Sequence, residues 1–206
     1  MAPNKPLGFR LTLEPDHPYL RERGLKPELV ELFGLGFCAK GSMSGRCCVP
    51  IENAEGELVA YAGRWAGPDA DLPAGEEKYK LPKGFHKGLE LFNLHRVRRY
   101  IHLVLVEGYF GAIRLHGERL PAAALMGSSI SEEQVDLLRE RCPNLAHVTV
   151  LMDGDDAGRK AAAAVAHALS RHWWTFTALL PEGTQPDTAA GHDLLAALRR
   201  KQRPLV

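Results

Sequence analysis

The segment Val148-Thr149-Val150-Leu151-Met152-Asp153-Gly154-Asp155 joins a short apolar run to two acidic residues that are separated by one glycine. The length of the run and its β-branched residues predict a buried strand. Three further apolar runs occur in the second half of the chain, at residues 103–106, 121–126 and 175–180. Helical stretches lie between the runs, including the capping-box pattern at 131–134 and the alanine-rich residues 158–169. This alternation predicts an α/β fold with a mostly parallel four-stranded sheet and helices on both faces.

Acidic residues follow three of the four predicted strands. Glu107 comes directly after the first strand, Asp153 and Asp155 follow the third, and Asp187 lies beyond the fourth. Sites in open α/β sheets form beyond the carboxyl ends of the strands, so we expect these carboxylates to converge there. Residues two apart in an extended chain point to the same side, and Gly154 permits a sharp turn between them. Converging carboxylates repel one another unless a cation neutralises them, and such oxygen ligands favour Mg²⁺ or Mn²⁺.

Simpler interpretations of the same residues are open at this point. Asp155 or Asp156 would serve as the N-cap of the helix that continues into residues 158–160. An isolated Asp-Gly-Asp is more often a turn than a metal site, and Glu107 alone would be an ordinary surface residue. The recurrence of acids at one edge of one predicted sheet favours the metal site.

The composition is that of a soluble globular protein, with 206 residues, 45% hydrophobic and 25% charged. No apolar run approaches the ~20 residues that a membrane-spanning helix needs, and residues 1–6 lack the apolar core of a signal peptide. These features predict a cytoplasmic location. The four cysteines form no C-x-x-C pair, so we expect buried, reduced thiols and no zinc site. The net charge of +1 does not by itself indicate a nucleic-acid partner.

The first half of the chain predicts a small α+β unit. Residues 28–33 follow a proline and predict a short helix, while apolar runs at 47–51 and 58–61 flank a polar turn and predict an antiparallel hairpin. The change of pattern after this unit places a domain boundary between residues 98 and 99. The predicted domains are therefore a basic N-terminal subdomain, 1–98, and an α/β domain, 99–206.

Two segments are rich in basic residues. The first contains Lys78, Lys80, Lys83, His86 and Lys87, with Tyr79 and Phe85 interleaved. A lysine-rich loop is usually only solvated, but interleaved aromatic residues suit stacking on single-stranded bases. The second segment is the tail from residue 199 to 203, which we expect to complement the dipole of a helix end. The adjacent tryptophans 173 and 174 predict core packing at the start of the fourth strand.

Several of these motifs occur in an order and spacing that resemble a known family. The motifs of the second half are Val106–Phe110, Ser128–Gln134, Met152–Ala162 and Leu180–Asp187. Those of the first half are Gly45-Arg46, Val49–Ile51, Gly56–Arg64, Lys78-Tyr79 and Phe85–Gly88. Together they resemble the Toprim domain of bacterial replicative (DnaG-type) primases and the small basic subdomain that precedes it. The resemblance covers most of residues 45–190.

The resemblance implies a role for each matching residue. Glu107 would position metal or act in proton transfer, and Asp153 and Asp155 would hold Mg²⁺, with Asp187 as a further metal ligand. The basic residues implied to hold nucleotide phosphate or template are Arg46, Arg64, Lys78 and Lys87. The function implied is a Mg²⁺-dependent nucleotidyltransferase core that synthesises primers from nucleoside triphosphates on single-stranded DNA.

The sequence also departs from the family pattern. Gly111 and Gln185 stand where the family has aspartates, and each change removes a carboxylate that would support a second metal. The zinc module and the helicase-contact domain of those primases have no counterpart in these 206 residues. We therefore expect a detached core that works with a separate zinc-module or helicase protein.

Two other functions are compatible with the same residues. A Toprim nuclease would use the same metal constellation to cleave phosphodiesters, and a weakened relative would bind nucleic acid without chemistry. The lysine-rich segment favours the primase over the nuclease, whereas Gly111 and Gln185 favour the weakened relative.

Overall fold

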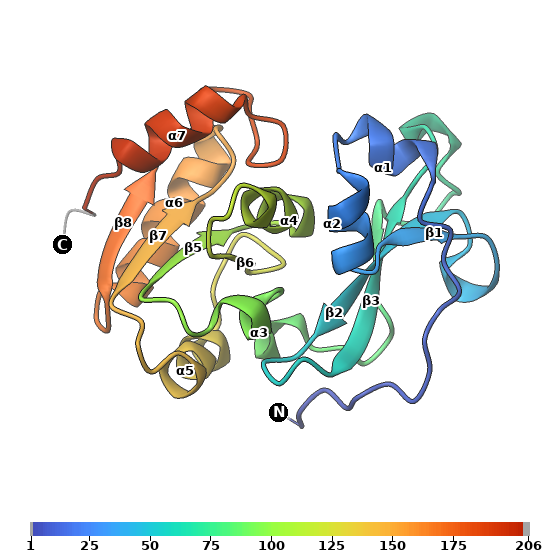
Figure 1. Cartoon of the computed structure of the whole chain (residues 1–206), viewed down its shortest axis with the longest axis horizontal. Helices are drawn as coiled ribbons and strands as arrows, with labels where there is room; N and C mark the ends of the chain where they lie inside the picture. Colours follow the sequence, from blue (N-terminus) through green and yellow to red (C-terminus); the bar gives the residue numbers. More distant parts are fainter. Residues whose placement is uncertain (1, 204–206) are drawn as a thin grey trace. The chain divides into compact units, whose positions relative to one another are not determined.

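The computed structural model describes residues 2–203, with Asp69 described by its backbone alone (Figure 1). The chain divides into two compact units. Unit 1 comprises the residues up to Glu52 together with Glu57–His86, and unit 2 comprises Asn53–Gly56 together with the residues from Lys87 onward. No helix in the described part of the chain has the length and apolar character needed to cross a membrane.

The chain passes from unit 1 to unit 2 between His86 and Lys87, whereas the sequence predicts a domain boundary between residues 98 and 99. The intervening segment packs with unit 2, because Leu91 and Leu94 lie in the same hydrophobic core cluster as Leu103. The basic segment is therefore shared between the units. Its last lysine, Lys87, belongs to the unit that carries the acidic residues.

Unit 1 is built on a four-stranded antiparallel sheet. Its strands, in spatial order, are β1 (Gly36–Cys38), β2 (Arg46–Glu52), β3 (Leu58–Trp65) and β4 (Tyr79–Lys80). The predicted hairpin is formed by β2 and β3, with Pro50 opposite Tyr61. Two helices, α1 (Pro18–Glu22) and α2 (Pro27–Leu32), each begin with a proline, which suits the first helical turn. Two 3₁₀ turns complete the unit, η1 (Gly41–Met43) and η2 (Asp69–Asp71).

Unit 2 is built on a four-stranded sheet in which all strands are parallel. In spatial order they are β6 (Ala122–Ala124), β5 (His102–Val106), β7 (His147–Leu151) and β8 (Trp174–Ala178). The predicted α/β fold with a mostly parallel four-stranded sheet is confirmed. The carboxyl ends of all four strands meet at one edge of the sheet, which is where the predicted acids follow β5, β7 and β8.

Helices cover both faces of this parallel sheet. The helical elements are η3 (Lys87–Leu89), α3 (Leu94–Val97), α4 (Tyr109–Gly117), α5 (Glu132–Arg141), α6 (Asp156–Leu169) and α7 (Gly191–Arg199). One core cluster joins Leu105 of β5 to Leu138 of α5 and Val165 of α6. Val106, the next residue of β5, faces the other side, where a Cβ added at Gly111 of α4 would lie 3.6 Å from its Cγ2.

Three smaller expectations have mixed outcomes. All four cysteines are buried, as predicted, and they are free thiols. Trp173 packs against the core cluster, but Trp174 is 57% exposed, so the prediction of core packing is wrong for Trp174. Consecutive residues of an extended chain face opposite ways, so Trp173, directly before β8, and Trp174, its first residue, do not share one core. In the tail, Arg199 occupies the last turn of α7, where it complements the helix dipole.

Candidate active site

Glu107 lies at the carboxyl end of β5, one residue before the N-cap of α4. Its side chain is half-buried, and burial raises the pKa of its carboxyl group above the usual value. The charge of Asp155 raises this pKa further, while the ammonium of Lys87 lowers it. Glu107 is therefore within electrostatic reach of an acid from the β7 loop and of a lysine from η3.

Asp153 and Asp155 leave the carboxyl end of β7 on a tight loop. A Cβ at Gly154 would overlap the carbonyl oxygen of Pro181, so no larger residue fits between the two acids. The backbone N–H of Gly154 donates to the carbonyl of Thr184 at 2.8 Å, and that of Gly183 donates to the carbonyl of Gly154 at 3.0 Å. These bonds hold the acidic loop against the loop that follows β8.

Asp153 has the most perturbed carboxylate of the group. Burial first, and then the charges of Glu107, Asp187 and Asp155, raise its pKa to about 6. One hydrogen bond opposes them, since Nε2 of Gln185 donates to Oδ2 of Asp153 at 2.6 Å. The four predicted acids therefore share one electrostatic environment at the carboxyl edge of the sheet.

Asp155 has a structural role that the sequence analysis left open. Its Oδ1 accepts a hydrogen bond of 2.6 Å from the backbone N–H of Gly158, which makes Asp155 the N-cap of α6. A Cβ at Gly158 would overlap the carbonyl oxygen of Asp153, so the start of this helix packs closely on the acidic loop. One carboxylate thus both caps the helix and contributes charge to Glu107 and Asp153.

The two replaced family acids are structurally accommodated. Gly111 is buried, and a Cβ there would lie 3.1 Å from Cβ of Pro186, so an aspartate would have to displace the loop after β8. Gln185 occupies the other position and uses its amide to donate to Asp153. The backbone carbonyl of Asp187 accepts from Nη1 of Arg114 at 2.7 Å, which ties the same loop to α4.

The donor chemistry fits a hard divalent cation. Three carboxylates raise the pKa of Asp153, and a cation is the usual way to neutralise such a group. Within residues 2–203, however, no three acid, histidine or cysteine side chains already stand in positions that would hold an ion. These residues thus provide the kind of ligand atoms that a divalent cation needs. One carboxylate oxygen of Asp153, however, accepts a hydrogen bond from the amide of Gln185.

Lys87 is held beside the acids by the start of α5. A Cβ at Gly127, in the loop after β6, would lie 3.0 Å from Nζ of Lys87. Ser131 and Gln134 form the predicted capping box, and both also bond outward. Oγ of Ser131 donates to the carbonyl of Gly88 at 2.6 Å, and Nε2 of Gln134 donates to the carbonyl of Glu90 at 2.7 Å. The sequence predicted the capping box, but it did not predict that the same two side chains would bond to the backbone of η3 and the residue after it.

The remaining predicted phosphate or template residues lie in unit 1. Arg46 is only 2% exposed, and its guanidinium donates to the carbonyls of Gly63 and Lys78 and to a carboxylate oxygen of Glu76. This arginine therefore organises the segment that carries Lys78, and its guanidinium does not face solvent. Arg64 lies over the ring of Tyr79 at 5.3 Å, and Lys78 is exposed.

Comparisons with known proteins match the chain to one domain family and to proteins named DNA primase. Residues 104–190 match the Toprim-like family model. A DNA primase from Pseudomonas putida strain KT2440 is 32% identical over an alignment that covers 91% of this chain and 35% of that protein. The chain thus spans about a third of the length of the curated relatives it matches.

Solved structures show the same fold. One is the structure of the zinc-binding and RNA polymerase domains of the Aquifex aeolicus primase. It has 28% sequence identity and a TM-score of 0.74, and the match covers 88% of this chain and 53% of that one. The DnaG primase catalytic domain bound to ssDNA has 24% identity and a TM-score of 0.74, covering 91% of this chain and 74% of that one. The chain therefore carries a Toprim-like domain and resembles the catalytic core of DnaG-type DNA primases.

Proposed function

We propose that this chain is a primase-like nucleotidyltransferase core that joins ribonucleotides into primers on single-stranded DNA. One observation carries the proposal: four carboxylates, from Glu107, Asp153, Asp155 and Asp187, share the carboxyl edge of a Toprim-like sheet with Lys87 beside them. The similarity to proteins named DNA primase supports it. Phosphoryl transfer depends mainly on positioning and charge neutralisation, which such an edge supplies.

In the proposed reaction the primer 3′-hydroxyl oxygen bonds to the α-phosphorus of a nucleoside triphosphate, and the bond to pyrophosphate breaks. Bound Mg²⁺ or Mn²⁺ would neutralise the triphosphate, and the four carboxylates are the residues that would hold it. Glu107 would accept the hydroxyl proton, because its raised pKa makes it a better base than an ordinary carboxylate. Lys87 supplies a positive charge for phosphate.

Binding of the template would use basic residues of both units. Arg64 and Lys78 of unit 1 and Lys87 of unit 2 are the proposed contacts, while Arg46 positions Lys78 from within unit 1. The related catalytic domain solved with ssDNA supports this choice of partner. A separate zinc-module or helicase protein, and action in the cytoplasm, belong to the same proposal.

A second candidate function is nucleic-acid binding with little or no catalysis. The hydrogen bond from Gln185 to Asp153 favours it, because an amide donor satisfies an oxygen that a metal would otherwise use. The buried Gly111 favours it as well, since its family counterpart is an acid.

Primer synthesis on single-stranded DNA distinguishes these functions. We would measure labelled oligoribonucleotides with Mg²⁺ or Mn²⁺, with and without a zinc-module protein, for wild type, Asp153→Asn and Asp136→Asn. Asp136 is an exposed acid of α5 that pairs with Arg139, so it controls for loss of one charge. Synthesis that disappears only in Asp153→Asn supports the primase.

The other outcomes contradict it in different ways. Phosphodiester cleavage that depends on Asp153, without synthesis, would identify a nuclease. DNA binding without any metal-dependent reaction, even with the partner protein, would leave the binding function.

A further inference from the structure

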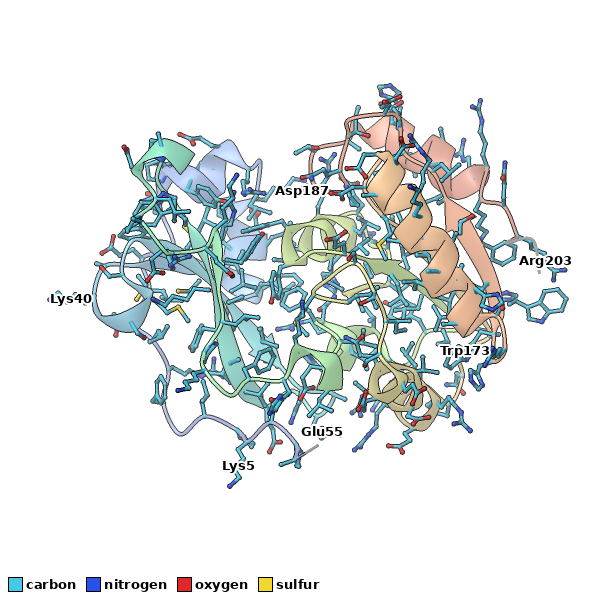
Figure 2. The ribbon with its side chains drawn as sticks, turned by 180° about the vertical axis from the view of Figure 1, so that it is seen from behind. Lys5, Lys40, Glu55, Trp173, Asp187 and Arg203 are labelled. Atoms are coloured by element: carbon cyan, nitrogen blue, oxygen red, sulfur yellow. The ribbon has the colours of Figure 1, made fainter. Side chains whose placement is uncertain are left out.

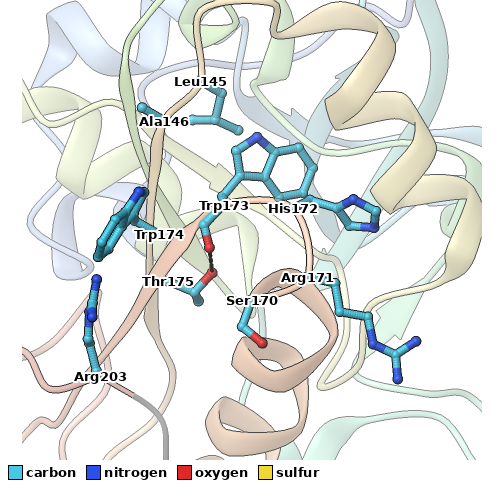
Figure 3. A pocket seen from close by; sticks show the side chains of 9 residues that line it. All are labelled: Leu145, Ala146, Ser170, Arg171, His172, Trp173, Trp174, Thr175 and Arg203. Carbon is cyan, nitrogen blue, oxygen red and sulfur yellow. Dashed lines mark hydrogen bonds between the residues drawn. The ribbon is translucent and has the colours of Figure 1, made fainter. Parts of the chain in front are cut away.

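A pocket lies in unit 2, at the amino end of β8. It has a volume of about 540 Å³ and is lined by residues that include Ser170, Arg171, Trp173, Trp174 and Arg203 (Figure 3). The acids lie beyond the carboxyl ends of the strands, and a five-residue parallel strand such as β8 spans about 16 Å. Trp173 and Asp187 accordingly lie at opposite ends of the unit in Figure 2. The pocket is therefore distinct from the acidic site.

One wall of the pocket is an exposed aromatic ring that a guanidinium stacks upon. Trp174 is 57% exposed, and Cζ of Arg203 lies 3.9 Å from the centre of its ring (Figure 3). The next outward-facing residue of β8, Phe176, has Nζ of Lys201 at 4.6 Å from its ring. Two cation–π pairs thus lie on the same face of β8, two residues apart along the strand.

The backbone of the tail holds these cations in place. Thr177 donates its N–H to the carbonyl of Gln202, and Gln202 donates its N–H to the carbonyl of Thr177, both at 2.8 Å. This pairing adds a short antiparallel segment to the edge of β8. Arg203 is consequently presented beside Trp174 by main-chain bonds, and the arrangement is built before any ligand arrives.

The chemistry of the lining selects a ligand that is both aromatic and anionic. Arg171 and Arg203 supply positive charge, Trp174 supplies an exposed stacking surface, and none of the described residues that line the pocket is acidic. A purely apolar partner would leave two guanidiniums without a counter-charge, whereas a simple anion would not use the indole. A nucleobase with its phosphate satisfies both parts of the site.

We propose that the pocket at the amino end of β8 binds a nucleotide unit, with the base stacked on Trp174 and the phosphate held by Arg203, while Arg171 adds positive charge to the lining. The unit would come from single-stranded nucleic acid or from a free nucleotide, since both carry the same chemistry. The site stands independently of the reaction proposed at the acidic edge, because none of its residues belongs to that edge.

Binding of a fluorescently labelled oligo(dT) to the full chain in EDTA tests the proposal without any contribution from metal at the acids. Trp174→Ala is expected to weaken binding about ten-fold, which is within the range for loss of one stacked base. Arg203→Ala should lower the log–log salt slope by about one, and Trp174→Phe should restore most of the affinity. Leu179→Ala and Arg139→Ala are controls that remove an exposed apolar and an exposed basic side chain outside the pocket. Neither variant should change the affinity or the salt slope.

Two further measurements distinguish a nucleic-acid strand from a free nucleotide as the ligand, and locate the site in the wild-type protein without the use of variants. An abasic oligonucleotide of equal length should bind more weakly than oligo(dT), and ATP that competes in a Trp174-dependent way would identify a free-nucleotide site. Ultraviolet crosslinking of an iodouridine oligonucleotide to wild type should label the peptide that contains Trp174. Wild-type affinity in folded Trp174→Ala and Arg203→Ala, or crosslinks confined to other peptides, would overturn the proposal.

Discussion

At Asp153 the protein uses an amide where the family pattern has a carboxylate. Nε2 of Gln185 donates to Oδ2 of Asp153, and this is the one contact that lowers the pKa of Asp153 against burial and three neighbouring charges. The amide therefore takes over part of the neutralisation that a cation would provide. This exchange predicts a site that binds divalent metal weakly, with an affinity controlled by residue 185.

Gln185→Asp is expected to raise the affinity for Mn²⁺ about ten-fold, because it removes the competing donor and adds an anionic oxygen ligand. Isothermal titration of wild type and the variant measures the change. Gln185→Ala separates the two causes, since it removes the donor without adding a ligand, and it should show a smaller gain. Equal Mn²⁺ affinity in all three proteins would mean that residue 185 does not face the metal.

Asp153→Asn should stabilise the metal-free protein while it removes activity. The pKa of Asp153 is about 6 in the folded state, above its ordinary value of 3.8, so its ionised form is destabilising at every pH above about 6. Asparagine keeps an oxygen for Gln185 and removes the charge. We expect a gain of about 1 kcal/mol at pH 7.5 after allowance for solvent screening, measured by urea unfolding in EDTA. A variant less stable than wild type would show that the ionised carboxylate of Asp153 is not destabilising in the folded protein.

The loops after β7 and β8 behave as one element, because Gly154 bonds to both Gly183 and Thr184. Gly154→Ala should be destabilising by about 3 kcal/mol, since its Cβ would overlap the carbonyl oxygen of Pro181. Gly183→Ala is the matched control. It has a positive φ of 74° but an open Cβ position, so only backbone strain of about 1 kcal/mol is expected. Equal losses in chemical denaturation would argue against the overlap.

The start of β5 makes the stability of unit 2 sensitive to acid. Nε2 of His102 lies 2.8 Å from Oγ1 of the buried Thr149 on β7. Burial first, and then the charges of Lys201 and His147, lower the pKa of His102 to about 4. As the pH falls below 6.5, His102 is protonated in the unfolded chain but stays neutral in the folded chain. Stability is therefore lost between about pH 6.5 and pH 4. His102→Gln should lose less stability over this range, as urea unfolding at pH 7.5 and pH 4.5 would show. A parallel pH dependence in both proteins would contradict the assignment.

The elements that the sequence predicted are those with a strong local signal. The strand 148–152 and the helix 158–169 match β7 and α6 to within two residues, because an apolar run and an alanine-rich stretch need no partner to be identified. The helix α4 was not predicted. Its N-cap is Gly108, which makes no side-chain hydrogen bond, so its start carries no capping signal.

Across the whole molecule, the acids of the site were predictable but their partners were not. Strand-end positions placed Glu107 and Asp153 at one edge, because parallel strands share a direction. The bond from Gln185 to Asp153 joins loops that follow different strands, and no local pattern encodes such a contact. The burial of Arg46 was not predictable either, because it depends on how the strands of unit 1 pack around its side chain.

The proposed binding of nucleic acid would involve the whole chain, because its proposed basic contacts come from both units and its net charge is only +1. Lys78→Ala and Lys87→Ala should each weaken binding to single-stranded DNA and lower the log–log salt slope by about one, with a loss of about two in the double variant. Lys40→Ala, which removes an exposed lysine outside the basic segment, is the control for a change of one charge (Figure 2).

Fluorescence anisotropy at several salt concentrations measures these slopes directly. In EDTA, Lys87 would contribute by its own charge and not through a metal at Glu107, so its effect should persist without Mg²⁺. A slope that changes equally in Lys40→Ala would show that the basic segment acts only through net charge. A slope that changes in Lys78→Ala but not in Lys87→Ala would restrict strand binding by the basic segment to unit 1, and Lys87 would then serve the triphosphate alone.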